Sequence, residues 1–418
     1  MNTQLEPPHA HVRAPQQGRL RVLIVHNRYQ QPGGEDAVFE AEASLLESFG
    51  HSVELYGRHN DELKHYSALR GARDAFWNTE TVKVLRPFCN RFRPHVVHVH
   101  NTFPLISPSV YWAAQSAGAA VVQTLHNYRL LCPQSFFVRS GRSCEDCLGH
   151  LPWRAIVHGC YRGSRHQSAV LVGMIAFHRA LRTHKARVSR FIALTDFARD
   201  KFIAGGFPPS KIAVKPNFIE DVGQATSQTR AGGLFVGRLS SQKGVELLVD
   251  ALAMCNPRPA FRLAGGGELE GLVHTTFGND WKGLLPRNDV LNEMRRAAFL
   301  VLPSLGFEGF PRTIVEAYSC GLPVLASRSG PLKQIVLDGE TGLLFEPGDA
   351  ADLARALQWA NAHPGELARM GMRARAEYES RYSPVQNYRQ LHAIYAEAVT
   401  SASGDFETSS AFSARAIE

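Results

Sequence analysis

The chain has 418 residues, of which 44% are hydrophobic and 20% are charged. These proportions are ordinary for a globular protein of two or three domains. No apolar run approaches the roughly 20 residues that cross a bilayer, and the longest, AVLVGMIAF at 169–177, has nine. A membrane-spanning chain is therefore not expected.

Both ends of the chain are poor in residues that pack. Residues 1–18, MNTQLEPPHAHVRAPQQG, lack the charged-then-apolar order of a signal peptide. They are predicted to form a disordered leader, and residues 401–418 a disordered tail. A cytoplasmic protein is the expectation that follows.

The formal net charge of +8 is concentrated in one segment, because Arg139 to Arg190 contain ten basic and only two acidic residues. Such a segment fits a phosphorylated acceptor or an anionic membrane surface. A solubilising face explains it equally well. The sequence has no helix-turn-helix, zinc-finger or stacking-aromatic pattern, so nucleic acid is not expected as a partner.

The first half of the chain alternates short β-branched runs with helical patterns. GGEDAVFEAEASLLESFGH (33–51) predicts a glycine turn followed by an amphipathic helix. The predicted strands are 20–26, 51–56, 95–100, 119–126 and 190–195. Near-continuous apolar strands like these are buried on both faces, as in a parallel α/β sheet.

A second strand series follows a polar stretch at 220–233. Its predicted strands are 233–237, 261–265, 298–304, 323–327 and 342–345, with helical patterns after most of them. The composition also changes there from basic to nearly neutral. We therefore predict two facing Rossmann-like domains, 19–216 and 233–395, joined by a linker at 217–232. Ligands bind such sheets at the carboxyl ends of the strands, so the predicted site is a deep interdomain cleft.

One loop at this edge carries a pair of acids. Glu308 lies in the loop after the strand at 298–304, and Glu316 lies about one and a half turns into the next helix. Pro311 suits the first helical turn, whose free N–H groups attract an anion such as diphosphate. Gly309 lets the backbone approach a ligand closely. Glu316 could accept both hydroxyls of a ribose and Glu308 those of a second sugar, although the spacing alone also fits an ordinary helix start.

Two cations follow another strand at the same edge. Arg238 and Lys243 lie in GRLSSQKG, directly after the strand at 233–237. Together they would offset the charge of a diphosphate. The chain has no G-x-x-x-x-G-K-[ST] loop, so a kinase or ATPase is disfavoured.

The second half of the chain resembles the donor-binding domain of family 4 glycosyltransferases of the GT-B fold. The matching segments, in the same order as in that family, are VGRLSSQKG, LAGGGELE, AFLVLPSLGFEGFPRTIVEAYSCGLPVLAS and DGETGLLFEPGD. The resemblance extends over nearly all of residues 20–395. It implies metal-independent, retaining transfer from a UDP- or GDP-sugar co-substrate to a glycan or lipid-linked acceptor, as in surface or exopolysaccharide synthesis, with no required cofactor. The implied donor contacts are Glu316 with ribose, Glu308 with the sugar, Arg238 and Lys243 with diphosphate, and Gly309 and Phe310 in the same loop.

The resemblance also assigns residues in the first half. Gly33 and Gly34 would form the turn near the donor phosphate and the acceptor. His126 ends the strand at 119–126, where the family places a histidine that reaches the donor sugar. With Glu308 it forms the predicted catalytic pair, and both are expected to position the sugar. His98 and His100 stay outside the predicted site.

Two positions depart from the family pattern. Pro311 stands where many relatives have a glycine, which removes one N–H from the phosphate-facing turn. Glu268 stands where a proline is common. Both make the identity of the donor less transferable from the family.

Four of the seven cysteines lie within 29 residues, in the spacing C-x11-C-x2-C-x12-C. A C-x2-C turn can supply two corners of a tetrahedral zinc site, whereas disulfides are not expected in the cytoplasm. The alternatives are a structural zinc that would brace the loop after His126, or four free thiols. These cysteines are Cys132, Cys144, Cys147 and Cys160, in an insertion near 132–160.

The segment 168–191 is apolar and then strongly basic. It is typical of a packed helix with a polar end, and the alternative is peripheral contact with an anionic membrane that presents the acceptor. Two other functions remain open for the chain as a whole. A sugar-nucleotide epimerase would need acid and base groups that flank the sugar ring, and the third function is binding of a sugar-nucleotide without turnover.

Overall fold

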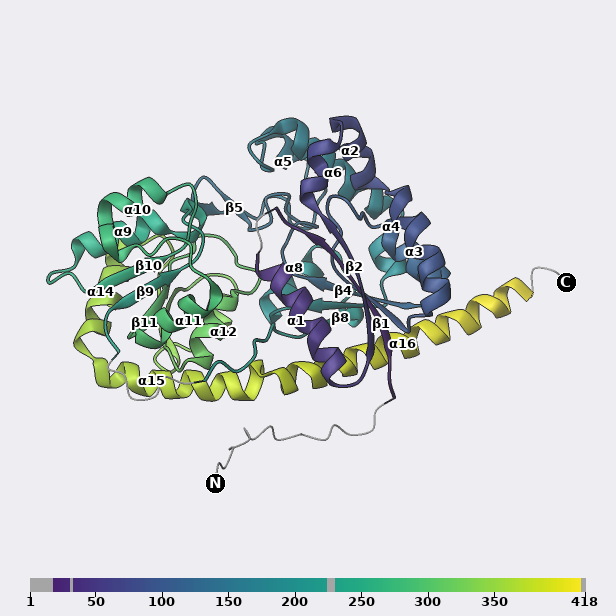
Figure 1. Cartoon of the computed structure of the whole chain (residues 1–418). Helices are drawn as coiled ribbons and strands as arrows, with labels where there is room; N and C mark the ends of the chain where they lie inside the picture. Colours follow the sequence, from purple (N-terminus) through teal and green to yellow (C-terminus); the bar gives the residue numbers. More distant parts are fainter. Residues whose placement is uncertain (1–17, 31–32, 224–229, 415–418) are drawn as a thin grey trace, which may run out of the picture.

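The computed structural model describes residues 18–30, 33–223 and 230–414. Two α/β domains lie side by side, with the chain passing from the N-terminal to the C-terminal one once and returning along a long final helix (Figure 1). The predicted leader lies outside the described residues except for Gly18, as do residues 224–229 of the predicted linker.

The N-terminal domain is built on a six-stranded parallel sheet in the order β2-β1-β3-β4-β7-β8. Every residue of β3 and β4 is buried, as expected for strands covered by helices on both faces. The strands are β1 (Arg21–Arg28), β2 (Ser52–His59), β3 (Val96–Asn101), β4 (Ala120–Leu125), β7 (Arg190–Ala193) and β8 (Ile212–Val214). The helices are α1 (Gly34–Ser48), α2 (Ala68–Phe76), α3 (Thr79–Phe92), α4 (Ser109–Ser116), α5 (Arg154–Val157), α6 (Arg165–Ala180), α7 (Thr183–Arg187) and α8 (Asp196–Ala204).

The C-terminal domain has a five-stranded parallel sheet in the order β10-β9-β11-β12-β13. Its strands are β9 (Gly233–Val236), β10 (Phe261–Ala264), β11 (Phe299–Leu302), β12 (Val324–Ser327) and β13 (Gly342–Phe345). Its helices are α9 (Val245–Met254), α10 (Glu270–Phe277), α11 (Arg287–Arg296), α12 (Arg312–Ser319), α13 (Leu332–Ile335), α14 (Ala350–Ala362) and α15 (Pro364–Glu377).

The ten predicted strands all occur at their expected places, and the predicted pair of Rossmann-like domains is confirmed. Strand β8 was not predicted, because it has only three residues and no alternating pattern to mark it. The short antiparallel hairpin of β5 (Val138–Arg139) and β6 (Arg142–Ser143) was not predicted either.

The end of the chain differs from the prediction. A π-helical turn, η5 (Tyr378–Tyr382), leads into α16 (Pro384–Ala414), which crosses back beneath the N-terminal sheet (Figure 1). Tyr388, Leu391 and Tyr395 of α16 are buried in the N-terminal core, so residues 384–395 do not pack as part of the C-terminal domain. The helix also covers residues 401–414 of the expected disordered tail. No proline interrupts it after Pro384, and extending a helix that packing has already nucleated costs little.

The apolar part of 168–191 forms α6, whose Leu171, Met174 and Ile175 are buried. This is the packed helix that the sequence favoured over a membrane contact. None of the described helices combines the length and apolar character needed to cross a bilayer.

Candidate active site

A cavity of about 560 Å³ lies between the domains. It is formed where loops leave the carboxyl ends of parallel strands in both sheets, the edge at which α/β sheets bind ligands. The residues of the predicted site that line it are Gly33, Gly34, His126, Arg238, Lys243, Glu308, Gly309 and Phe310. The structure therefore brings together residues from four segments that are far apart in the sequence.

The N-terminus of α12 faces this cavity. Pro311 is the N-cap residue in an extended conformation, and Arg312 and Thr313 of the first helical turn line the wall. The backbone N–H groups of a first turn lack helical partners and carry partial positive charge. An anion in the cavity would meet this helix end, as the sequence predicts.

Glu308 is paired with the lysine predicted to hold diphosphate. The Nζ atom of Lys243 lies 2.6 Å from Oε1 of Glu308, and the Ser304 hydroxyl donates to the same oxygen at 2.6 Å. The Glu308 side chain is only 9% exposed, while that of Lys243 is 30% exposed. Lys243 is therefore held at the cavity wall by Glu308 and still presents part of its ammonium group to a ligand.

Arg238 is the second cation that the sequence predicted for diphosphate. Its side chain is exposed at the cavity wall, and no acid in the described part of the chain forms an ion pair with it. A guanidinium in this position can donate forked hydrogen bonds to a diphosphate without giving up a protein partner.

The two domains meet closely at Gly309. A Cβ atom on this residue would lie 1.9 Å from the carbonyl oxygen of His126, so only glycine fits. The close approach is thus between two loops of the protein, in addition to any approach to a ligand. Beside it, the ring of Phe307 packs against Phe197 at 4.9 Å and against Phe137 at 6.0 Å between ring centroids. The C-terminal loop is therefore anchored in the N-terminal core, and the cavity is closed on this side.

Glu316 does not line the cavity. Its carboxylate lies 3.8 Å from Arg312 and 3.9 Å from Arg287, and its side chain is 12% exposed. Burial raises the pKa of Glu316, and the two arginines oppose that rise. Its contact with ribose stays a prediction, and in the structure its carboxylate faces the two arginines.

Gly33 and Gly34 form the turn that opens α1. Gly33 is the N-cap, and its N–H donates to Oδ2 of Asp36 at 2.7 Å. The other oxygen of Asp36 lies 3.0 Å from Nε2 of His26 at the end of β1. This capping arrangement positions the glycine turn at the cavity.

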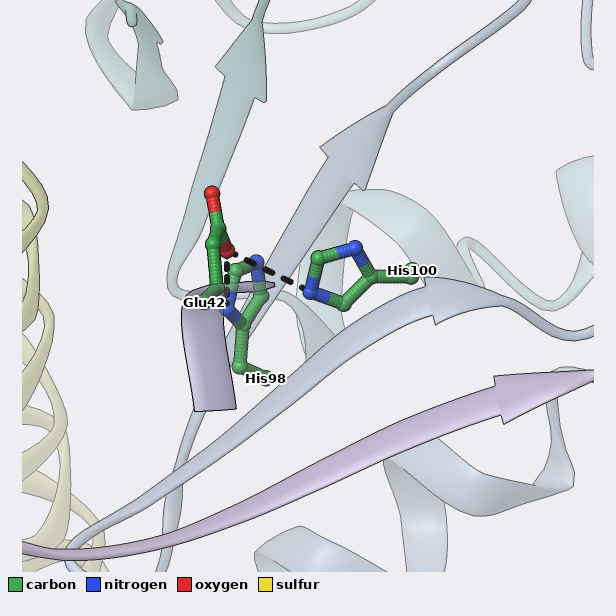
Figure 2. Close-up of side chains that lie close together, drawn as sticks. All are labelled: Glu42, His98 and His100. Carbon is green, nitrogen blue, oxygen red and sulfur yellow. Dashed lines mark ion pairs between the residues drawn. The ribbon is translucent and has the colours of Figure 1, made fainter. Parts of the chain in front are cut away.

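His126 is connected to a buried polar network behind the cavity. Its Nε2 lies 2.9 Å from Nδ1 of His100, whose Nε2 in turn lies 3.4 Å from the carboxylate of Glu42. The carboxylate of Glu42 contacts both His98, at 3.6 Å, and His100, at 3.4 Å (Figure 2). Burial lowers the pKa of His126 well below its usual range. The imidazole is therefore neutral at physiological pH, which suits a hydrogen-bonding role better than that of a proton donor.

Glu42, His98 and His100 are also the described residues whose ligand atoms lie close enough to hold a metal ion, all within 4.8 Å of one another. Glu42 already pairs with a cation of the protein. Nζ of Lys215 lies 2.7 Å from Oε1 of Glu42, and both side chains are fully buried. His98 is also engaged, through Tyr395 at 2.8 Å and Thr124 at 2.7 Å. The cluster therefore fits a structural charge pair better than a metal centre.

Sequence reasoning missed several polar residues of the cavity. Arg129 follows His126 by three positions, and Arg312 directly follows Pro311, so their nearness to motif residues could have marked them as site residues. Asn217 lies at the end of the N-terminal domain, where no motif marked it as a site residue. All three line the cavity, and each has a buried polar atom without a hydrogen-bond partner in the described residues. Buried polar groups of proteins are nearly always paired, so a polar ligand or ordered water is expected beside these three residues.

Comparison with known proteins agrees with this geometry. Residues 13–217 match the family model for a glycosyl transferase 4-like domain, and residues 224–377 match the model for glycosyl transferases group 1. The D-inositol 3-phosphate glycosyltransferase of Streptomyces bingchenggensis is 30% identical over 243 residues, which cover 50% of this chain and 53% of that protein. The amylovoran biosynthesis glycosyltransferase AmsK of Erwinia amylovora is 26% identical over 176 residues, 38% of this chain and 43% of that protein.

The chain thus spans about half the length, or less, of these curated relatives. Among solved structures, Anabaena Alr3699/HepE in complex with UDP is similar at a TM-score of 0.63 and 20% identity, covering 90% of this chain and 100% of that one. The likeness confirms the GT-B fold. Since the two family models together cover both domains, the chain belongs to the group 1 glycosyltransferases of the GT-B fold.

Proposed function

We propose that the chain transfers a sugar, with retention of anomeric configuration and without a metal ion, from a nucleoside-diphosphate sugar to a glycan or lipid-linked acceptor. The observation that carries the proposal is the convergence of Arg238, Lys243 and the N-terminus of α12 on one cavity whose other wall holds His126. The further cations Arg129 and Arg312 line the same cavity and support an anionic ligand.

The chemistry follows from where charge develops. Cleavage of the bond between the anomeric carbon and the phosphate oxygen leaves negative charge on the diphosphate and positive character on the sugar. Arg238, Lys243 and the helix end would stabilise the leaving diphosphate, which is the role that a metal plays elsewhere. Glu308 and the neutral His126 would position the sugar. We propose that the acceptor attacks from the face that the diphosphate leaves, because the resemblance to the family identifies no obvious protein nucleophile.

The pairing of Lys243 with Glu308 refines this assignment. A donor diphosphate would share the ammonium group with Glu308, so the lysine would hold the phosphate and the acid at a set distance from each other. The sugar attached to that phosphate would then lie next to Glu308. This is the order of contacts expected for a sugar-nucleotide that extends from α12 toward His126.

The relatives indicate which ligands to test first. A structural neighbour was solved with UDP, with UDP-glucose, and with UDP and glucose, so UDP-sugars lead the panel. The name of the Erwinia relative refers to biosynthesis of amylovoran, and we propose polysaccharide synthesis as the setting.

The test is incubation of the full chain with a panel of UDP- and GDP-sugars, followed by product analysis and thermal shift. Slow release of nucleoside diphosphate, with the α- or β-configuration of the donor kept in the sugar transferred to an acceptor, is expected. Ligand at about 100 times its Kd should add about 2.7 kcal/mol of stability. Interconversion of the sugar would establish an epimerase instead, and binding without turnover a binding protein.

Variants locate the reaction in the cavity. Arg238→Ala should weaken binding of the stabilising nucleotide at least tenfold, while Lys333→Ala, outside the cavity lining, should leave it unchanged. Equal affinity in both variants would refute the role of the cations.

We also propose a peripheral contact with anionic lipid as the means of reaching a lipid-linked acceptor. Arg182 and Lys185, at the exposed basic end of the α6–α7 region, support it. The chain should then sediment with phosphatidylglycerol vesicles at low salt and leave them at high salt. Absence from the vesicle pellet at low salt would end this part of the proposal.

A further inference from the structure

The four clustered cysteines belong to one compact element, the four-cysteine loop, which we define as residues 132–160. Cys132 precedes the β5–β6 hairpin and Cys144 follows it, so the hairpin brings these two together. The N–H of Cys144 donates to the carbonyl of Phe137 at 2.7 Å, which closes the base of the hairpin. Cys147 comes three residues later, and Cys160 returns after α5.

All four cysteines line the same small cavity, of about 20 Å³. The three other cysteines of the chain are buried elsewhere: Cys89 in α3, Cys255 after α9 and Cys320 after α12. None of the seven forms a disulfide. Four thiols that line one small cavity are a donor set that zinc prefers.

Cys132 is held in place by backbone hydrogen bonds. Its carbonyl oxygen accepts the N–H of Ser135 at 2.8 Å, and its own N–H donates to the carbonyl of Tyr128 at 2.8 Å. Cys132 and Cys147 are buried, while Cys144 and Cys160 are half-buried. The four thiols therefore lie on a folded loop and face a largely enclosed space.

We propose that Cys132, Cys144, Cys147 and Cys160 bind one structural Zn²⁺ ion. The thiols lose their protons to solvent as the four Zn–S bonds form. No three of the sulfur atoms lie within 4.8 Å of one another, so the side chains turn inward on binding. Zinc thiolates at about 2.3 Å from the metal require that approach.

The site braces the wall of the cavity between the domains. Phe136 follows Cys132 by four residues, and its carbonyl accepts the N–H of Phe307 at 2.8 Å. Ser135 and Phe136 line the cavity itself. Across the loop, Lys201 of α8 pairs with Glu145 at 2.7 Å. The ion would therefore hold the surface on which the C-terminal loop at 305–309 closes, without entering the transfer reaction.

The test is metal analysis of the full chain, purified without a metal-binding tag and without donor, so that its outcome does not depend on the proposed function. About one equivalent of zinc is expected in the wild-type chain. The double variant Cys144→Ser with Cys147→Ser should hold less than about a tenth of an equivalent, whereas Cys255→Ser should keep the full amount.

A second measurement tests the proposal even if the double variant does not fold. Cobalt added to the metal-stripped wild-type chain should produce the absorption of tetrahedral cobalt thiolate, and zinc should displace it and raise the unfolding midpoint. A wild-type chain with less than about a tenth of an equivalent of zinc and no cobalt–thiolate band would overturn the proposal. The proposal would also be overturned if the folded double variant held a full equivalent of zinc. It would likewise be overturned if the wild-type chain held iron and sulfide in place of zinc.

Discussion

Replacement of Gly309 by alanine tests whether closure of the two domains controls the site. The added Cβ would start 1.9 Å from the carbonyl oxygen of His126, and an ordinary contact begins near 3.4 Å. The two loops must therefore part by about 1.5 Å. The nearest atoms belong to the carbonyl group of His126 and to Cα of Asn127. Both are backbone, so no side chain can rotate to relieve the clash. The backbone of Gly309 itself is one that alanine can adopt, so the effect is steric.

The expected cost is about 1–3 kcal/mol, the usual range for overpacking at a close contact. Since the strain is relieved by opening the cleft, it should appear as lost ligand affinity, about 5- to 150-fold. Turnover should fall further, because a misplacement near 1 Å can cost about a hundredfold in rate. The assays are calorimetric titration and donor hydrolysis with whichever nucleotide-sugar stabilises the wild-type chain.

Gly271→Ala is the matched control. Gly271 lies in α10, where a Cβ would meet no atom within 4 Å, and alanine suits a helix better than glycine. Its affinity and turnover should equal those of the wild-type chain. If Gly309→Ala bound the donor within twofold of wild type, the argument that this contact sets the closed cleft would be refuted.

Two further predictions concern the buried network behind the cavity. Glu42→Gln should lower the free energy of unfolding by about 3–5 kcal/mol in urea titrations, because it strands the buried ammonium group of Lys215. The side chain of Glu40, on the same helix, is 57% exposed, so Glu40→Gln should change the free energy of unfolding by less than about 0.5 kcal/mol. Equal effects of the two substitutions would show that Glu42 and Lys215 are not a buried pair in solution. The second prediction is a loss of stability in acid: burial lowers the pKa of His98 and of His126 well below the ordinary value, so the unfolded chain binds protons first as the pH falls below about 6.5. Each histidine should then remove about 1.4 kcal/mol per pH unit, and a flat stability profile between pH 7 and pH 5.5 would contradict the neutral, buried state of both rings.

The arrangement of elements was open to sequence reasoning because its signals are local. Apolar runs that are short and nearly continuous predicted ten strands of the two parallel sheets, and the glycine and proline residues marked the turns at their ends. Since parallel strands all end at one edge, motifs after different strands were expected to meet, and Arg238, Lys243 and Glu308 do line one cavity. Each of those inferences needed only the neighbours of a residue in the chain.

Contacts between residues far apart in the sequence could not be predicted from local patterns. The pairing of Glu42 with Lys215 joins residues 173 positions apart, and the return of α16 to the N-terminal domain buries Tyr395 against His98 across 297 positions. The contact between Gly309 and His126 likewise depends on how the two domains meet. The sequence by itself thus determined the strands, their order in the chain and the loops that carry polar groups. Only the tertiary structure decided which of those groups pair with each other and which stay free for a ligand, because burial and distance depend on packing between segments that no local pattern records.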